Sequence, residues 1–370
     1  MYLKPSRRKK RRRLTSIIIA VAIAAAAVLG IFLYLDNFTD FSFTKPMLRE
    51  TSVTLPENAA ANANGILYMQ DGSLYLMDKT GAESWSLKLN DGGASKFTVS
   101  EKLICSYSQT SLQVLTFNKE ELFTTSLDSE IMGVQCGNNT VAVLTSAVDE
   151  TGIQKYYIYL FNEKGEQSGK PIDFSTRPVI DFGFQGENDM LWALSLNSAG
   201  VVPVSYVTTY KTDGSITGNI EINTQLVERV TVTGDSIFAS GTNNLIKYNY
   251  FGEKQGDVSI YGWKPVASSN GASLTLAYIS RADLVNIESA LIITGDLSSH
   301  IIRLPYDVFS IAVSQNKLYA YTANEIYEYT FDGKLERSVK IDQPITMAKQ
   351  VSSDTAVVWD AQKSYLMSLS

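Results

Sequence analysis

The sequence offers few residues for nucleophilic or metal chemistry. Its one histidine is His300, in the phrase LSSHIIRL. A histidine-based zinc site needs more ligands of this type, and a serine or cysteine nucleophile would depend on this single base. No G-x-S-x-G nucleophile elbow precedes it. His300 is therefore interpreted as a surface or turn residue, and the sequence predicts no catalytic, cofactor-binding or metal-binding residue and no cofactor.

Paired carboxylates are the other chemistry to consider. Glycoside hydrolysis needs two acids about 5 to 10 Å apart in a cleft. Asp181 lies in VIDFGF, a predicted inner strand that faces a central channel, while Asp296 and Asp307 lie near the ends of one repeat unit. Most other Asp and Glu residues fall in predicted hairpin turns, where they have a structural role. Asp181 is the channel candidate, and whether the protein is an enzyme is left open, with a non-enzymatic function preferred.

The N-terminal sequence is typical of a membrane anchor. The candidate residues above therefore belong to a domain that we expect to be exported. Residues 17–35, from Ile17 to Leu35, carry no charge and span roughly 28 Å as a helix, close to the thickness of a bilayer core. The basic residues before this helix predict a cytoplasmic tail, residues 1–16, and an exported remainder. Ala24 to Ala27 leave a cleavable signal peptide as an alternative, although apolar sequence resumes after them. The basic residues are Lys4, Arg7, Arg8, Lys9, Lys10, Arg11, Arg12 and Arg13.

The exported part is acidic and has the composition of a β-sheet protein. Without the eight basic residues of the tail, 24 Lys and Arg stand against 38 Asp and Glu, a net charge of −14. Nucleic acid is therefore an unlikely partner, because phosphate binding depends on clustered cations. Tyr, Thr, Val, Ile and Ser are abundant, and Gly and Asn punctuate the chain. Cys105 and Cys136 are the only cysteines, and their residue types leave a disulfide undecided.

A repeated unit predicts the fold. Its copies start near residues 66, 102, 140, 190, 236, 273, 317 and 355, a mean step of about 41 residues, which is the period of a four-stranded propeller blade. The phrases DKTGAE, NEKGE, KTDGS, YFGEK and FDGK occupy the hairpin between the third and fourth strands. We expect an all-β fold, a β-propeller of eight four-stranded blades, with seven blades if the degenerate sixth unit is an insertion.

Ring closure gives the domain limits. The eighth unit lacks its fourth strand, and residues 51–55, TSVTL, have the alternation to supply it. Joining both ends of a ring in one blade removes exposed sheet edges. We therefore expect a short juxtamembrane linker at residues 36–50 and an extracytoplasmic propeller at residues 51–370.

The layout resembles the uncharacterised, membrane-anchored propeller proteins of Gram-positive bacteria. The hairpin phrases are similar to those of WD40/YVTN-like repeats and of the quinoprotein-like (PQQ-like) propeller superfamily, which includes the lipoprotein propeller that helps assemble outer-membrane barrels. The resemblance covers roughly residues 51–370 and implies a propeller fold and a scaffold function. It carries over no functional residue, because the tryptophans occupy non-equivalent positions: Trp85, Trp192, Trp263 and Trp359.

Three functional hypotheses remain. The leading one is a membrane-tethered, non-enzymatic scaffold that binds an envelope protein, while its helix and basic tail contact membrane lipid. We expect recognition at the longest loops, from Val148 to Lys155 and from Asn197 to Val204, because loops on a rigid scaffold usually carry binding. The alternatives are an envelope glycan hydrolase or lyase that uses channel carboxylates such as Asp181, and a ligand-binding sensor that works with a membrane partner.

Overall fold

A computed structural model describes residues 48–89, 95–185, 189–270, 273–283 and 285–369. The predicted cytoplasmic tail and membrane helix and most of the predicted linker lie outside these ranges. Within them, no helix is long and apolar enough to cross a membrane.

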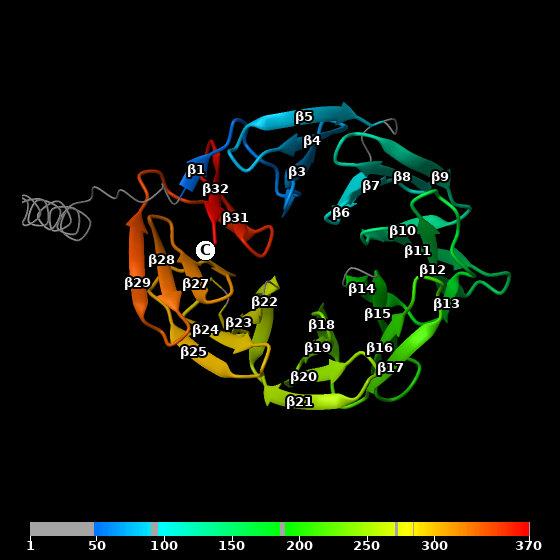
Figure 1. Ribbon diagram of the computed structural model, residues 1–370. Helices are drawn as coiled ribbons and strands as arrows, with labels where there is room; N and C mark the ends of the chain where they lie inside the picture. The colour runs from blue at the N-terminus through cyan, green and yellow to red at the C-terminus, as the bar shows by residue number, and fades with distance from the viewer. Residues whose placement is uncertain (1–47, 90–94, 186–188, 271–272, 284, 370) are drawn as a thin grey trace, which may run out of the picture. The chain divides into compact units, whose positions relative to one another are not determined.

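The described residues form eight four-stranded antiparallel sheets, or blades, arranged in a ring (Figure 1). We name the strands of each blade A to D from the ring centre outward. Blade 1 is β2 (Ala60–Asn62), β3 (Gly65–Gln70), β4 (Ser73–Met77) and β5 (Glu83–Lys88); blade 2 is β6 (Lys96–Val99), β7 (Leu103–Tyr107), β8 (Ser111–Thr116) and β9 (Glu121–Ser126); blade 3 is β10 (Glu130–Cys136), β11 (Thr140–Val148), β12 (Gln154–Asn162) and β13 (Ile172–Ser175); blade 4 is β14 (Val179–Gln185), β15 (Met190–Asn197), β16 (Val204–Tyr210) and β17 (Ile216–Ile222).

The second half of the ring repeats this order, and only blade 8 draws on both ends of the chain. Blade 5 is β18 (Val227–Val232), β19 (Ser236–Gly241), β20 (Asn244–Asn249) and β21 (Lys254–Ser259); blade 6 is β22 (Trp263–Asn270), β23 (Leu274–Ser280), β24 (Ser289–Thr294) and β25 (Ser299–Arg303); blade 7 is β26 (Ser310–Val313), β27 (Lys317–Tyr321), β28 (Glu325–Thr330) and β29 (Leu335–Lys340); blade 8 is β30 (Met347–Gln350), β31 (Thr355–Trp359), β32 (Ser364–Ser368) and β1 (Leu48–Glu50).

The prediction of eight four-stranded blades is therefore confirmed, and the seven-blade alternative is wrong. The sixth unit, whose turns are degenerate in sequence, forms a complete sheet from β22 to β25. Its inner strand contains Pro265 and no clear apolar alternation, so its sequence resembles a loop. Pairing along the whole length of β23 holds it in the sheet.

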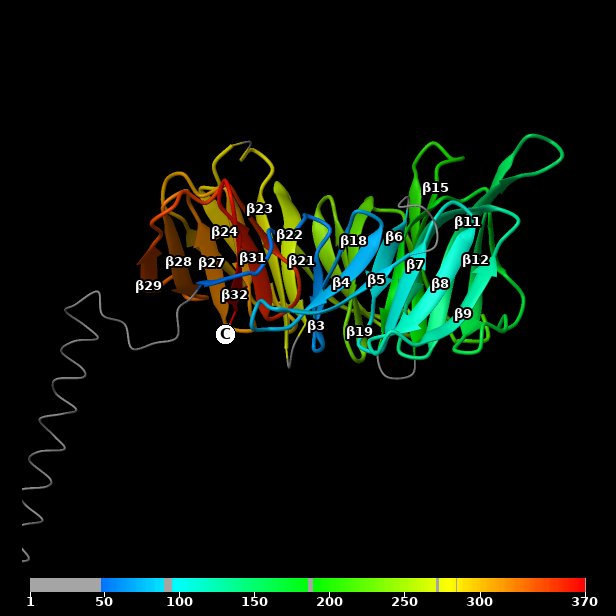
Figure 2. The ribbon, with the colours of Figure 1, turned by 90° about the horizontal axis from the view of Figure 1, so that it is seen from above.

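The connections between strands divide the ring into two faces (Figure 2). Because successive strands are antiparallel, the A–B and C–D connections lie on one face, here called the A–B face. The B–C connections and the links between blades lie on the other, the B–C face. The longest B–C connections, after β11 and after β15, project from this face (Figure 2).

The hydrophobic core lies between neighbouring blades. One cluster joins Leu103 and Val114 of blade 2 to Val134 and Val143 of blade 3, and similar clusters lie between other adjacent blades. B strands are packed on both surfaces, so β3 reads as a nearly continuous apolar run, whereas the outer β5 alternates toward solvent. This difference is why the B strands mark the repeat so clearly in the sequence.

The predicted hairpins between C and D strands are also confirmed. Each contains a glycine with positive φ, which is the conformation that favours glycine in a tight turn. Their side chains cap the same turns: Asp78 accepts hydrogen bonds from the backbone amides of Thr80 and Ala82. The glycines are Gly81, Gly165, Gly214, Gly252 and Gly333.

The closing strand differs from the prediction. The strand that completes blade 8 is β1, at residues 48–50, and not residues 51–55. The hydroxyl of Thr51 donates a hydrogen bond to the carbonyl of Val53, at 2.7 Å, and the amide of Leu55 donates to the hydroxyl of Ser364, at 2.8 Å. One more backbone bond follows β1, from the amide of Thr51 to the carbonyl of Ser364 at 3.0 Å. Beyond it, side-chain hydroxyls replace the regular ladder, because such groups compete with strand pairing.

Candidate functional site

The A–B face opens into a cavity of about 680 Å³ on the inner strands. This volume is within the range of small-molecule binding sites. Blades 1, 2, 3, 4 and 6 contribute to it. The cavity is lined by Ala61, Asn62, Val99, Ser100, Glu101, Gln135, Cys136, Gly137, Asn138, Asp181, Phe182, Gly183, Phe184, Gln185, Asp189, Trp192 and Asn270.

The predicted channel candidate, Asp181, lies in this cavity, three residues into β14. Its Oδ1 accepts a hydrogen bond of 2.9 Å from the backbone amide of Phe182. Burial raises the pKa of the Asp181 carboxyl, and the Phe182 amide and the charge of Arg229 partly oppose this rise. No Lys or Arg of the described residues forms an ion pair with Asp181 within 4 Å. Asp181 is thus an incompletely compensated acid on a cavity wall.

Asp189, which the sequence did not single out, is fixed in a structural role. It is 2% exposed and lies in the A–B connection of blade 4. Its carboxylate oxygens accept hydrogen bonds from the backbone amides of Asn138 and Asn139, at 2.5 and 2.6 Å. A Cβ atom at Gly137 would lie 2.5 Å from Asp189 Oδ1, so glycine leaves room for the carboxylate. Asp189 therefore ties the A–B turn of blade 3 to blade 4.

Carboxamide side chains on the A–B face join blades in the same way. Asn62 donates to the carbonyl of Ser100, at 2.5 Å, and Asn270 donates to the carbonyl of Val232, at 3.1 Å. In the amide orientation that satisfies both of its neighbours, Gln185 also donates to Val232, at 3.0 Å. These three amides of the cavity lining are therefore used for contacts between blades.

Gln350 extends this pattern away from the cavity. Its Nε2 donates to the carbonyl of Ser268, at 3.0 Å, and of Val313, at 2.8 Å, so it contacts blades 6 and 7 from blade 8. The hydroxyl of Ser269 donates to the carbonyl of Ser353, at 3.1 Å. Blades 6 and 8 are thus joined directly, beside the inner strand of blade 7.

The B–C face is different, because apolar side chains are exposed on it. Most of the large apolar residues that are exposed in the described part of the chain lie in its connections. Tyr306, for example, is 82% exposed between β25 and β26. The two loops predicted for recognition each contribute two of these residues. The exposed apolar residues of this face are Val53, Val148, Ile153, Val201, Val202, Leu226, Tyr261, Val285 and Tyr306.

Charge on the B–C face is predominantly negative. Among the described residues of its connections, the basic side chains are few and already have partners. Arg281 pairs with Glu228 at 2.6 Å, Lys363 pairs with Glu50 at 2.7 Å, and the guanidinium of Arg177 lies 5.0 Å from the ring centre of Tyr206. The acidic residues are Glu57, Asp71, Asp128, Asp149, Glu150, Asp283, Glu288, Asp307, Asp342 and Asp360.

The remaining sequence candidates lie apart from the cavity. His300 is an exposed residue of β25. Asp296 lies in the C–D turn of blade 6, where it accepts hydrogen bonds from Thr294 and Ser298, and these bonds lower the pKa of its carboxyl to about 2. Asp307 is exposed on the B–C face. Within the described ranges, no three His, Cys, Asp or Glu residues are grouped to hold a metal ion.

The two cysteines lie in one buried cluster between blades 2 and 3, and both are free thiols. The thiol of Cys136 donates to the carbonyl of Leu103, at 3.6 Å. Burial, and then the neighbouring Cys136, raise the pKa of the Cys105 thiol. The structure therefore contains two buried thiols that are not joined by a disulfide.

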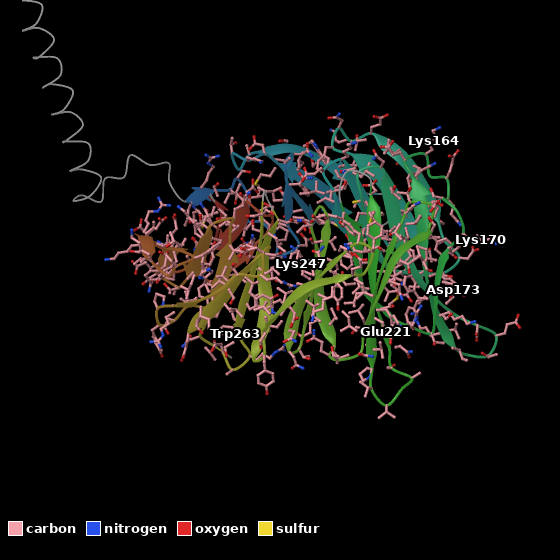
Figure 3. All side chains as sticks on the ribbon, turned by 60° about the horizontal axis from the view of Figure 1, so that its bottom comes forward. Lys164, Lys170, Asp173, Glu221, Lys247 and Trp263 are labelled. Atoms are coloured by element: carbon pink, nitrogen blue, oxygen red, sulfur yellow. The ribbon has the colours of Figure 1, made fainter. Side chains whose placement is uncertain are left out.

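Charged side chains lie along the outer edges of the blades. Lys164, Lys170 and Asp173 project from the edge of blade 3, and Glu221 projects from the outer strand of blade 4 (Figure 3). Charges on outer strands protect sheet edges from pairing with other chains. Lys247 instead lies over the ring of Phe238, 5.3 Å from its centre, and donates to the carbonyl of Gly295. The described outer strands β13 and β17 therefore present charged side chains, whereas the connections of the B–C face present apolar ones.

The architecture defines a β-propeller. No protein-family model and no curated protein sequence matches this chain. Many solved structures are similar to it, and three of them illustrate the likeness. These are BamB from Moraxella catarrhalis (10% identity, 87% of this chain and 99% of that chain, TM-score 0.55), the WD40 domain of SCAP from fission yeast (11%, 90% and 97%, 0.60) and Saccharomyces cerevisiae Sqt1 (11%, 88% and 100%, 0.56). At such low identity, these similarities support the fold alone.

Proposed function

We propose that this protein is a membrane-tethered, extracytoplasmic propeller that binds a protein partner through its B–C face and catalyses no reaction. The observation that carries the proposal is the concentration of exposed apolar side chains on that face. Exposed apolar patches on soluble domains mark interaction sites. The partner that fits is a protein with apolar anchors and basic side chains, because the uncompensated charges around the patch are acidic.

The tether is proposed from the N-terminal sequence. The uncharged segment from Ile17 to Leu35 and the basic residues before it favour a single-pass helix with a cytoplasmic N-terminus. The basic tail would also contact anionic lipid. The propeller then lies in the cell envelope, where a scaffold can hold a partner near the membrane.

Site-directed photo-crosslinking tests the binding surface. A photo-reactive residue replaces Val201 or Tyr306 on the B–C face, or Ile216 or Phe251 outside it, in the full-length protein in its native membrane. We expect the first two positions to crosslink to one common protein and the other two to give no such product. The double substitution Val201→Ser with Val202→Ser should abolish this crosslink from position 306 without changing stability by more than about 0.5 kcal/mol.

Two outcomes would contradict the proposal. Equal crosslinking from both sets of positions would indicate non-specific proximity. The absence of a common product from Val201 and Tyr306, with the protein folded and at native abundance, would remove the B–C face as a docking surface.

The tether has its own test. Membranes are washed at alkaline pH, and protease is added to intact cells stripped of their outer layers. We expect the full-length protein to stay in the membrane and a C-terminal tag to be cleaved from outside. A tag protected until the membrane is broken would place the propeller in the cytoplasm and reverse the proposed topology.

A further inference from the structure

The cavity on the A–B face has a charge character that selects its ligands. Three acidic side chains line it, Glu101, Asp181 and Asp189, and its described lining contains no Lys, Arg or His. The nearest cation that acts on this lining is Arg229 of the inner strand β18, whose charge lowers the pKa of the Asp181 carboxyl. The three acids outnumber it, so an anionic ligand would be repelled. Neutral and cationic ligands remain. Which polar groups of the lining already have hydrogen-bond partners distinguishes between these two classes.

The polar groups of the lining are unequally available. Asp189 is occupied by two backbone amides, and the amides of Asn62, Gln185 and Asn270 bind backbone carbonyls of neighbouring blades. A neutral saccharide needs several free amide and carboxylate groups to read its hydroxyls. The commitment of these three amides leaves only Gln135 and Asn138 as carboxamides that could contact a ligand, so the cavity is poorly suited to a saccharide.

Asp181 and Glu101 have free acceptor capacity. Oδ2 of Asp181 has no partner among the described residues, and Glu101 accepts only one long hydrogen bond there, 3.3 Å from the amide of Ala63. Asp181 lies on an inner strand, whereas Glu101 lies in the exposed A–B connection of blade 2. A positive group bound beside Asp181 would compensate a carboxylate that burial disfavours.

Aromatic residues complete the wall. Phe182, Phe184 and Trp192 line the cavity, and the ring of Trp192 packs over Gly183, where a Cβ atom would lie 3.1 Å from the indole. Phe182 and Trp192 are largely buried in the cores between blades, so Phe184 is the most accessible of the three rings. Aromatic rings attract organic cations, and aliphatic stems pack against them. Carboxylates and aromatic rings together are the surroundings that a bound alkylammonium group requires.

We propose that this cavity binds an organic cation with an aliphatic stem, whose ammonium or guanidinium group pairs with Asp181. The same chemistry could come from a free polyamine or from a basic side chain of a peptide. This site is on the face opposite the proposed protein-docking surface, so it does not depend on the proposed function.

Calorimetric titration of the full-length protein tests the proposal. The probes are spermidine, N-acetyl-lysine N-methylamide and the neutral disaccharide chitobiose. We expect saturable binding of an ammonium probe and no binding of chitobiose. Asp181→Asn should weaken the ammonium probe at least about tenfold, equivalent to 1.4 kcal/mol. Tight binding of spermidine alone would identify a free polyamine as the source, and binding of the capped lysine would identify a peptide side chain.

The matched control is Asp213→Asn, which removes an exposed carboxylate from a C–D turn on the same face. It should leave the affinity unchanged. Phe184→Leu is a second variant that keeps the carboxylate, and it should also weaken binding, accompanied by a smaller ligand-induced change in Trp192 fluorescence. Equal affinity in the wild type and Asp181→Asn, no binding of either ammonium probe at millimolar concentration, or preferential binding of chitobiose would each overturn the proposal.

Discussion

The indole N–H of Trp359 donates a hydrogen bond of 2.6 Å to the carbonyl of Leu55, and this bond joins the two ends of the propeller. Trp359 ends β31 in blade 8, while Leu55 follows the closing strand β1. Both residues are buried and belong to one cluster that spans blades 8 and 1. Ring closure therefore depends on a specific side-chain contact as well as on strand pairing.

The substitution Trp359→Phe should weaken this closure. It keeps an aromatic ring but leaves the buried carbonyl of Leu55 without its donor, so we expect the free energy of unfolding to fall by about 2 kcal/mol. Urea unfolding followed by circular dichroism measures the change. Trp263→Phe, at a partly exposed position on β22, is the control and should change stability less. Equal losses in the two variants would show that the hydrogen bond to Leu55 contributes nothing specific.

The Asp189 clamp should be important for stability. Asp189→Ala leaves the amides of Asn138 and Asn139 without their acceptor, and we expect a loss of about 3 kcal/mol in the free energy of unfolding, because hydrogen bonds to charged groups are the stronger ones. Asp213→Ala, in an exposed turn, should be much less destabilising. Thermal unfolding of both variants checks the difference. A wild-type melting temperature in Asp189→Ala would contradict the assigned role.

Acid should destabilise the propeller through its turn aspartates. Hydrogen bonds lower the pKa of Asp78, Asp149, Asp213, Asp296 and Asp332, that of Asp296 to about 2. A carboxyl with a lower pKa in the folded state stabilises that state above its unfolded pKa, and the contribution is lost as pH falls toward the folded pKa. We expect stability to decline as pH falls below about 4. Asp296→Asn should reduce this decline, and an unchanged pH profile in that variant would refute the assignment.

The cysteines should be unreactive in the native protein. Both thiols are buried, and the raised pKa of Cys105 disfavours its reactive thiolate. We expect slow labelling by a thiol reagent at neutral pH and rapid labelling of both residues after unfolding. Intact mass spectrometry without reductant provides an independent check. A mass lower by two hydrogens would show that Cys105 and Cys136 form a disulfide in the cell.

Local patterns in the sequence predicted most of the fold. The eight B strands start within one residue of the predicted repeat positions, because strands covered on both surfaces need continuous apolar residues. Asp181 was placed on an inner strand because its short strand lies just before the repeat unit that starts near residue 190. The inner strands β2 and β22 were not predicted, since Ala60–Asn62 and a strand containing Pro265 lack alternation.

Contacts between residues that are far apart in the sequence could not be predicted from these local patterns. Asp189 binds a loop of blade 3, and Gln350 binds inner strands of blades 6 and 7. Nothing in their local sequence distinguishes them from ordinary surface polar residues. The shift of the closing strand to Leu48–Glu50 has the same origin, because the contacts of Thr51 with Ser364 are made across 313 residues. The free thiols and the commitment of the cavity amides likewise follow from three-dimensional packing.

The composition of blade 8 from both ends of the chain has a consequence for biosynthesis. The outer strand of this blade emerges first, and its partner β32 emerges more than 300 residues later. At a typical rate of synthesis, the delay is about 15 to 60 s. Throughout that interval β1 and the last completed blade have unpaired edges, so a nascent chain is vulnerable to proteases and to its neighbours until its final residues arrive.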